Sequence, residues 1–178
     1  MKKTNDTKSS SKSSRLNSIR LVKFDNRSNT VYNTIMKKIK IILDTNILFT
    51  ALRSSRGASF KLLSLIPSQL FSLSVSVPLV VEYEDVLKRS KNLEYLKNRD
   101  IDEFIDFIVS VAEHKKIHYL WHPFLKDPCD DMLVELAVAS NADVIVTYNK
   151  KDFKNVAERF GVKIIDAKEL LELIGELS

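Results

Sequence analysis

Acidic and polar side chains follow the apolar runs of this 178-residue chain at several places. Asp44 and Asn46 come directly after one such run, and Thr147, Asn149 and Asp152 follow another. Between them lie further acids, at Glu82 and at Asp127, Asp130 and Asp131. Carboxylates that converge in one cleft repel each other unless a cation neutralises them. Oxygen ligands suit Mg²⁺ or Mn²⁺, so the pattern predicts a metal site for a metal-dependent hydrolase.

Helical phase distinguishes Asp130 from Asp131. The residues three, four and seven positions after Asp130 are apolar, which places Asp130 at the leading end of a buried helix face. Asp131 instead leads onto Glu135, the only charged residue inside this helix, so we expect Asp131 to be exposed. Capping of the helix N-terminus is the alternative role for both acids.

The same logic selects Glu82 on the helix that Pro78 begins. Glu82 and Glu84 both flank the apolar face of that helix, but Glu82 lies one turn closer to its start. The carboxyl ends of the strands should lie there. We expect Glu84 and Asp85 to form a solvated helix surface.

The elements that position these residues alternate between strands and helices. Short apolar runs predict five strands, at residues 39–43, 70–75, 116–121, 143–147 and 163–165. Amphipathic segments predict helices at residues 46–53, 57–66, 78–89, 100–113, 130–140 and 167–177. This alternation predicts an α/β fold, with a parallel sheet of about five strands covered by helices on both faces. In such sheets ligands bind beyond the carboxyl ends of the strands.

The charge divides the chain into a basic extension, residues 1–37, and a globular domain, residues 38–178. Residues 1–38 hold ten Lys or Arg against two Asp, so the other 140 residues hold 18 basic and 21 acidic side chains. We expect the Ser- and Asn-rich extension to be disordered. It could attract nucleic acid or have no role. Met36, directly before the first strand, is a candidate natural start.

Composition excludes several classes of protein. Cys129 is the only cysteine, so no intrachain disulfide can form, which fits the cytoplasm, and we expect this thiol to be buried rather than reactive. No apolar run approaches the ~20 residues of a membrane span. The histidines, His114, His118 and His122, are four residues apart, but extended structure would separate them, so we expect no zinc site.

Four segments in this order resemble the PIN domain family. They are Ile41-Ile42-Leu43-Asp44-Thr45-Asn46, then Val81-Glu82-Tyr83, then Asp127-Pro128-Cys129-Asp130-Asp131, and finally Val144-Ile145-Val146-Thr147-Tyr148-Asn149 with Lys151-Asp152-Phe153. The resemblance covers about residues 38–175. It is closest to the VapC-like ribonuclease toxins of prokaryotic type II toxin–antitoxin systems. It implies a Rossmann-like sheet, Mg²⁺-dependent ribonuclease activity, a cognate antitoxin and a homodimer.

The resemblance also implies roles for single residues. Asp44, Glu82 and Asp130 match the first three acidic positions of the family, and Asn46 and Thr147 match its recurrent polar positions. Asn149 stands where the family often has Asp, and we expect Asp152 to supply the missing carboxylate, with Asp131 as a neighbouring ligand. This departure leaves open whether one or two metal ions bind.

The expected reaction is hydrolysis of RNA phosphodiesters. Bound Mg²⁺ would neutralise phosphate oxygens, orient an in-line attack and lower the pKa of a water molecule. Because the domain itself is slightly acidic, basic side chains near the cleft should help attract RNA. The candidates for phosphate contacts are Arg53, Arg56, Lys126, Lys150 and Lys151. For each of them an ordinary solvated charge is the alternative.

Three other functions are alternatives to the nuclease. A haloacid-dehalogenase-like phosphatase also has an Asp after its first strand, but it needs a second Asp where this chain has Asn46. A receiver domain shares the general fold but needs an early acidic pair that is absent here. A degenerate PIN domain would bind RNA or a partner without cutting, and Asn149 is the residue that favours it.

Overall fold

A computed structural model describes residues 38–68, 70–117, 125, 128–153 and 155–177. The basic extension, its Met36, the histidines at 118 and 122, and Lys126 lie outside the described residues. Within them, no helix is both long and apolar enough to cross a bilayer.

Five parallel strands form one sheet in the order β3-β2-β1-β4-β5. The strands are β1 Ile39–Leu43, β2 Phe71–Val75, β3 Glu113–His114, β4 Val144–Val146 and β5 Lys163–Ile165. The α-helices are α2 Thr45–Arg53, α3 Ala58–Ser64, α4 Val77–Arg89, α5 Asn98–Val111, α6 Pro128–Ser140, α7 Val156–Phe160 and α8 Ala167–Leu173. Two 3₁₀ turns, at Ile66–Ser68 and Lys91–Leu93, complete the described elements. The predicted α/β fold with a parallel five-stranded sheet is confirmed.

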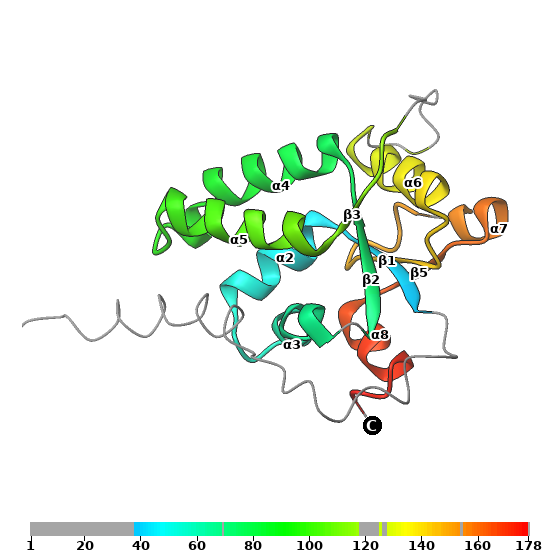
Figure 1. Cartoon of the computed structure of the whole chain (residues 1–178), viewed down its shortest axis with the longest axis horizontal. Coiled ribbons are helices and arrows are strands. Elements are labelled where there is room, and N and C mark those ends of the chain that lie inside the picture. Colours follow the sequence, from blue (N-terminus) through cyan, green and yellow to red (C-terminus); the bar gives the residue numbers. More distant parts are fainter. Residues whose placement is uncertain (1–37, 69, 118–124, 126–127, 154, 178) are drawn as a thin grey trace, which may run out of the picture.

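The helices cover both faces of the sheet. Helix α6 packs against β1, β2 and β4, while α3 packs against α8, and the strands lie between α6 and α8 in Figure 1. The residues of β4 and the last three residues of β1 are accordingly almost inaccessible to solvent. Near-continuous apolar runs are typical of parallel strands that are buried on both faces. The core therefore fixes the two central strands rigidly.

The order in which the chain adds strands to the sheet reverses at β1. The connections from β1 lead outward to β2 and β3, and the chain then crosses back to β4 on the other side of β1. This arrangement creates a topological switch point, where the loops after β1 and β4 diverge and leave a crevice. The fold therefore predicts a ligand site beyond Leu43 and Val146.

The third strand was predicted in the wrong place. We expected it at residues 116–121, but β3 comprises Glu113 and His114, which pair with Ser74 and Val75 at the sheet edge. Both β3 residues are exposed, so this short edge strand has no apolar alternation by which to recognise it. Residues 118–121 lie outside the described part of the chain.

Helix α7 was not predicted at all. It has only five residues, and it ends at Gly161, whose φ of +69° is the left-handed conformation that favours glycine. Such a short helix shows too little periodicity to recognise in a sequence. The other predicted helices are present with ends shifted by a few residues, as is usual for helix boundaries.

Candidate active site

Asp44 lies at the switch point with its carboxylate surrounded by hydrogen-bond donors. Its side chain is buried, and Oδ2 accepts bonds from Thr147 Oγ1 and from Asn46 Nδ2, both at 2.6 Å. Oδ1 accepts the backbone N–H of Asn46 at 3.2 Å. The amide of Asn46 also donates to Thr147 Oγ1 at 3.1 Å. Asp44, Asn46 and Thr147 therefore form one connected group across the ends of β1 and β4.

Local structure explains this arrangement. Asp44 is the N-cap of α2, with an extended backbone and a side chain that accepts from the first turn. Capping and a functional role are compatible here, because the positive end of a helix dipole favours a carboxylate at this position. The backbone N–H of Asp44 donates to Val146 O at 3.0 Å, which extends the pairing of β1 with β4 by one residue. The two strands therefore stay paired up to Asp44, beyond which their loops diverge.

Glu82 reaches the same site from α4. Thr45 Oγ1 donates to Glu82 Oε1 at 2.6 Å, and the other carboxylate oxygen of Glu82 is buried. Thr45 directly follows Asp44, so the two predicted acids are joined through one intervening side chain. Glu84 and Asp85 are exposed on α4, as predicted.

Tyr83 connects α4 to the end of β1, directly before Asp44. This side chain is fully buried, and its hydroxyl donates to the carbonyl oxygen of Leu43, the residue before Asp44. Burial raises the pKa of Tyr83 well above its usual value, and the negative charges of Asp44 and Glu82 raise it further. The phenol is therefore a permanent donor, and it lies in the combined field of both acids.

Burial also acts on Asp44 itself. It raises the pKa of this carboxyl above the usual 3.8, although the hydrogen bonds from Thr147, Asn46 and Thr45 oppose the shift. Burial disfavours the charged form of a carboxyl, and a nearby cation favours it. A buried acid of this kind, in a crevice and beside a second acid, is a candidate functional group.

A second series of hydrogen bonds begins at Thr147. Its Oγ1 accepts the backbone N–H of Asn149 at 2.9 Å, and the amide of Asn149 donates to the carboxylate of Asp152. Asn149 and Asp152 are both exposed. Asp152 is thus connected to Asp44 through Asn149 and Thr147, at the solvent side of the crevice.

Helix α6 supplies Asp130 and Asp131 in its first turn. Asp130 is half-buried. Asp131 was predicted to be exposed, and this prediction is wrong, because its side chain is buried and its Oδ1 accepts the backbone N–H of Leu125 at 2.8 Å. The sequence could not show this bond, because the donor is a backbone group in a loop.

Among the described residues, no three Asp, Glu, His or Cys side chains lie close enough together to hold a metal ion. Asp44 and Glu82 both lie near Tyr83, and Thr45, the neighbour of Asp44, donates to Glu82. Asp130 belongs to α6, and Asp152 is linked to Asp44 through Asn149 and Thr147.

The candidate basic residues differ in their surroundings. Lys150 forms ion pairs with Asp166 and Glu169, and hydrogen bonds to Glu169 and then Asp166 raise its pKa. The guanidinium of Arg53 lies 5.5 Å from the ring centre of Phe49, and Arg56 and Lys151 are exposed. Lys151 is therefore less constrained than its neighbour Lys150.

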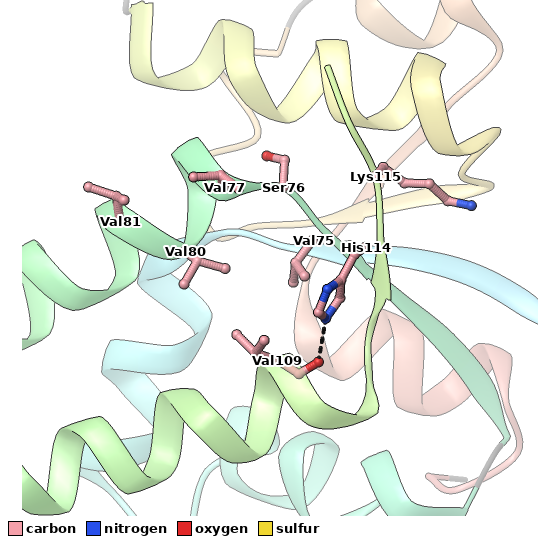
Figure 2. Close-up of a pocket in the computed structure, with 8 residues that line it drawn as sticks. All are labelled: Val75, Ser76, Val77, Val80, Val81, Val109, His114 and Lys115. Carbon is pink, nitrogen blue, oxygen red and sulfur yellow. Dashed lines mark hydrogen bonds between the residues drawn. The ribbon is translucent and has the colours of Figure 1, made fainter. Parts of the chain in front are cut away.

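A separate apolar hollow lies between α4, α5 and the end of β2. Four of its lining residues are Val75, Val77, Val80 and Val109, and none of the candidate site residues lines it (Figure 2). His114 also lines the hollow, where its Nε2 lies 2.8 Å from the carbonyl oxygen of Val109. His114 is thus occupied by a structural contact.

The comparisons with known proteins agree with the arrangement of these residues. The sequence model of a PIN domain matches residues 40–151, which span every candidate position from Asp44 to Lys151. The chain belongs to the PIN domain family. Of the candidate residues, only Asp152 falls outside the match, directly beyond its end.

No curated protein matches this PIN domain. One similar solved structure is VapBC2 from Rickettsia felis bound to a DNA fragment from their promoter. The two chains are 18% identical with a TM-score of 0.47, and the alignment covers 71% of this chain and 97% of that chain. Family membership confirms the resemblance that the four sequence segments suggested, and it disfavours the phosphatase and receiver-domain alternatives.

Sequence reasoning missed two residues of the site. Thr45 joins Asp44 to Glu82, and Tyr83 ties α4 to the end of β1. Each is the immediate neighbour of a predicted acid, and that adjacency was the available signal. Hydroxyl side chains next to buried carboxylates are good candidates for site residues, because buried charges need hydrogen-bond donors.

Proposed function

We propose that this PIN domain is a Mg²⁺- or Mn²⁺-dependent endoribonuclease that hydrolyses RNA phosphodiesters, acting in the cytoplasm as the toxin of a toxin–antitoxin pair. PIN domains are generally nucleases that use divalent metals, so family membership supports the general class. The observation that carries the proposal is the pairing of buried Asp44 with Glu82 through Thr45 at the switch point of the sheet.

The donor set suits a hard divalent cation. The groups at the end of β1 and on α4 offer carboxylate, hydroxyl and amide oxygens, which Mg²⁺ and Mn²⁺ prefer. Burial raises the pKa of Asp44, and both acids raise that of Tyr83, so a positive charge would relieve an unfavourable field. Asp44 and Glu82 would hold the ion, and Asp130, Asp131 and Asp152 are the candidates for additional ligands.

Each side chain then has a definite task. A divalent ion, when bound, would act as a Lewis acid toward a phosphate oxygen. Thr147 and Asn46 hold the Asp44 carboxylate in one orientation through Oδ2. Asp152 is exposed and would help orient the attacking water, while the amide of Asn149 donates to its carboxylate. Thr45 fixes Glu82 in the same way.

Basic residues around the crevice would contact the phosphates of the RNA. Lys151, Arg53 and Arg56 are exposed and can supply such contacts. We also retain Lys126 and Lys150 as candidates, although Lys150 already pairs with Asp166 and Glu169. Phosphate contacts of this kind determine affinity and position rather than sequence preference.

The partner of a toxin would be its antitoxin. We propose that a basic segment of such a protein occupies the acidic crevice and blocks it. The charges of Asp44 and Glu82 support this, because an Arg or Lys side chain could satisfy the same oxygens as a metal ion. The partner should therefore compete with Mn²⁺ for binding to the domain.

A homodimer is the second assembly that we propose, with α4 and α5 as its face. Val77 is 77% exposed and Val81 is 58% exposed, beside the apolar hollow of Figure 2. Clustered apolar side chains at a surface are typical of interaction sites. Sedimentation equilibrium should show a dimer that the double variant Val77→Glu/Val81→Glu dissociates, and a monomeric wild type would contradict this face.

A PIN domain that binds RNA without cutting it is the second candidate function. Asn149 favours it, because this residue places an amide where the family often has a carboxylate, and that amide is occupied by Asp152. Such a protein would bind RNA tightly and show no Mg²⁺-dependent cleavage.

The decisive experiment compares wild type, Asp44→Asn and Asp85→Asn on single-stranded RNA with Mg²⁺ or EDTA. Asp85 is exposed on the same helix as Glu82 and forms an ion pair with Arg89 at the surface, so it serves as the matched control. We expect Asp44→Asn to lose about a thousandfold in cleavage rate, since a metal ion supplies several kcal/mol. Wild-type activity in Asp44→Asn would refute the proposal.

Sequencing the RNA ends after brief expression of wild type and Asp44→Asn would identify the target. Circular dichroism and thermal melting of each variant would establish that folding is intact. Cleavage ends that appear equally with both proteins would come from another nuclease and would count against the assignment.

A further inference from the structure

Tyr148 directly follows a residue of the candidate site and is exposed, whereas the other aromatic side chains that the structure describes are buried or half-buried. Its relative exposure is 45%, and it is the only aromatic residue in the exposed class among the described residues. It directly follows Thr147, whose hydroxyl binds Asp44. Neither capping, packing of the core nor the acid chemistry accounts for a large exposed ring at this position.

Both ends of Tyr148 are fixed. Its backbone N–H donates to Asn46 Oδ1 at 3.2 Å, and its hydroxyl lies 2.8 Å from Oγ of Ser59. Ser59 belongs to α3 and is completely buried, so the tip of the Tyr148 side chain is held against the domain. The tip of the ring is therefore fixed, although 45% of the residue as a whole is exposed.

A fixed, exposed ring is suited to stacking. Proteins that bind single-stranded nucleic acid stack bases on aromatic side chains, beside basic groups that follow the backbone. Lys151, three residues further on, is exposed and supplies such a basic group. Because Tyr148 is already held at both ends, little conformational freedom would be lost when a base packs on it.

We propose that Tyr148 is a stacking platform for the nucleobase next to the phosphate that a metal ion at Asp44 and Glu82 would contact. This inference rests on the proposed function in that the ligand is RNA, but it concerns binding rather than cleavage. Asn46 connects the cleavage site with the stacking platform. Its amide nitrogen donates to Asp44, and its amide oxygen accepts the backbone N–H of Tyr148. Stacking selects the position of the strand and tolerates any base.

The test measures binding separately from cleavage. The probe is a fluorescein-labelled ten-nucleotide single-stranded RNA, together with ten versions that each carry one abasic position. Fluorescence anisotropy in Mg²⁺ gives the affinity of the cleavage-deficient Asp44→Asn protein for each probe. We expect one abasic position, or two adjacent ones, to weaken binding about 5- to 150-fold.

Two further variants in the Asp44→Asn background assign that loss to the ring. Tyr148→Ala should bind the intact RNA as weakly as the abasic probe, and the abasic penalty should disappear. Tyr148→Phe keeps the ring and loses the bond to Ser59, so it should retain most of the penalty. A merely structural role would weaken all probes equally in Tyr148→Ala and would leave the penalty unchanged, which would overturn the proposal.

The remaining outcomes separate this proposal from the proposed function. Position-specific binding without any cleavage by wild type would support the platform and refute the nuclease assignment. Cleavage by wild type with equal affinity for all eleven probes would refute the platform alone. Failure of Asp44→Asn to bind any probe would also overturn the platform, because the ring is unchanged in that variant.

Discussion

Thr147 donates its hydroxyl to Oδ2 of Asp44 over 2.6 Å, although 103 residues separate them in the chain. The pairing of β1 with β4 brings them together, and Leu43 lies opposite Val146 in the register that precedes both residues. This contact of the candidate site is thus a direct extension of the sheet.

Removal of this hydroxyl should weaken the site without unfolding the domain. We expect Thr147→Val to lower Mn²⁺ affinity and cleavage by roughly 10- to 100-fold, as is usual for partners that orient metal ligands. Calorimetric titration with Mn²⁺ and the RNA cleavage rate give the two values. Thr147→Ser keeps the hydroxyl and is the matched control, and equal losses in both variants would contradict an orienting role.

Tyr83 and Tyr95 offer a matched pair for stability and function. Both hydroxyls donate to backbone carbonyls, Tyr83 to Leu43 beside the site and Tyr95 to Leu52 at the far end of α2. Each Tyr→Phe variant should lose about 1–3 kcal/mol of unfolding free energy, because an acceptor loses its donor. Urea denaturation measures this.

The two variants should differ in metal binding. Only Tyr83→Phe should weaken Mn²⁺ binding as well, because its partner directly precedes Asp44. If Tyr95→Phe weakened metal binding to the same extent, the effect would be a general consequence of lost stability.

Burial of Asp44 has a consequence for the pH dependence of stability. Its pKa is raised above the usual 3.8, so folding favours the neutral form. The contribution of this group to the free energy of unfolding is fully present below pH 3.8. It is lost as the pH rises through the raised pKa of the folded state. In EDTA, Asp44→Asn should therefore melt higher than wild type at neutral pH, and the difference should shrink on acidification.

Melting curves of both proteins from pH 7 down to pH 4 would measure this. Divalent metal should reverse the order at neutral pH, because it stabilises the charged carboxylate of wild type alone. A difference that grew on acidification would show that Asp44 is stabilised as an anion by the protein itself.

Asp131 should act on stability more than on catalysis. Asp131→Ala removes the acceptor for the buried N–H of Leu125 and should cost about 1–3 kcal/mol of unfolding free energy. Asp131→Asn keeps an oxygen acceptor and should lose less. A loss of Mn²⁺ affinity in Asp131→Asn at unchanged stability would instead assign this residue to the metal.

Lys150 and Lys151 are adjacent but should contribute differently to RNA binding. Lys151→Ala should weaken RNA binding several-fold, because an exposed phosphate contact is lost. The slope of log K against log salt concentration should become shallower by about one. Lys150→Ala should have a smaller effect, since Lys150 pairs with Asp166 and Glu169. Anisotropy titrations at several salt concentrations test this, and a larger effect from Lys150→Ala would reverse the assignment.

The sequence was sufficient to predict the parts of this molecule that depend on local apolar pattern. The bounds of β1 and β5 were predicted as observed, because an aspartate directly follows the apolar residues of each strand, Asp44 after β1 and Asp166 after β5. The positions of Asp44 and Thr147 followed from the strands that precede them. The parallel arrangement of the sheet followed from the alternation of strands and helices.

Other features depend on contacts that no local pattern encodes. The strand β3 consists of exposed polar residues and is defined only by its pairing with β2. Asp131 is buried because of a backbone donor at Leu125, and helical phase considers only the helix itself. The bond from Thr45 to Glu82 joins residues 37 positions apart and requires the packed position of α4.

The division of the site between the two central strands has a consequence for synthesis. Asp44 emerges from the ribosome early, but Thr147, which orients it, is made more than one hundred residues later. A growing chain therefore carries an incomplete centre until β4 has been translated and has paired with β1. A nuclease whose centre is divided in this way would be harmless to the messenger and the ribosome that produce it until β4 has been made.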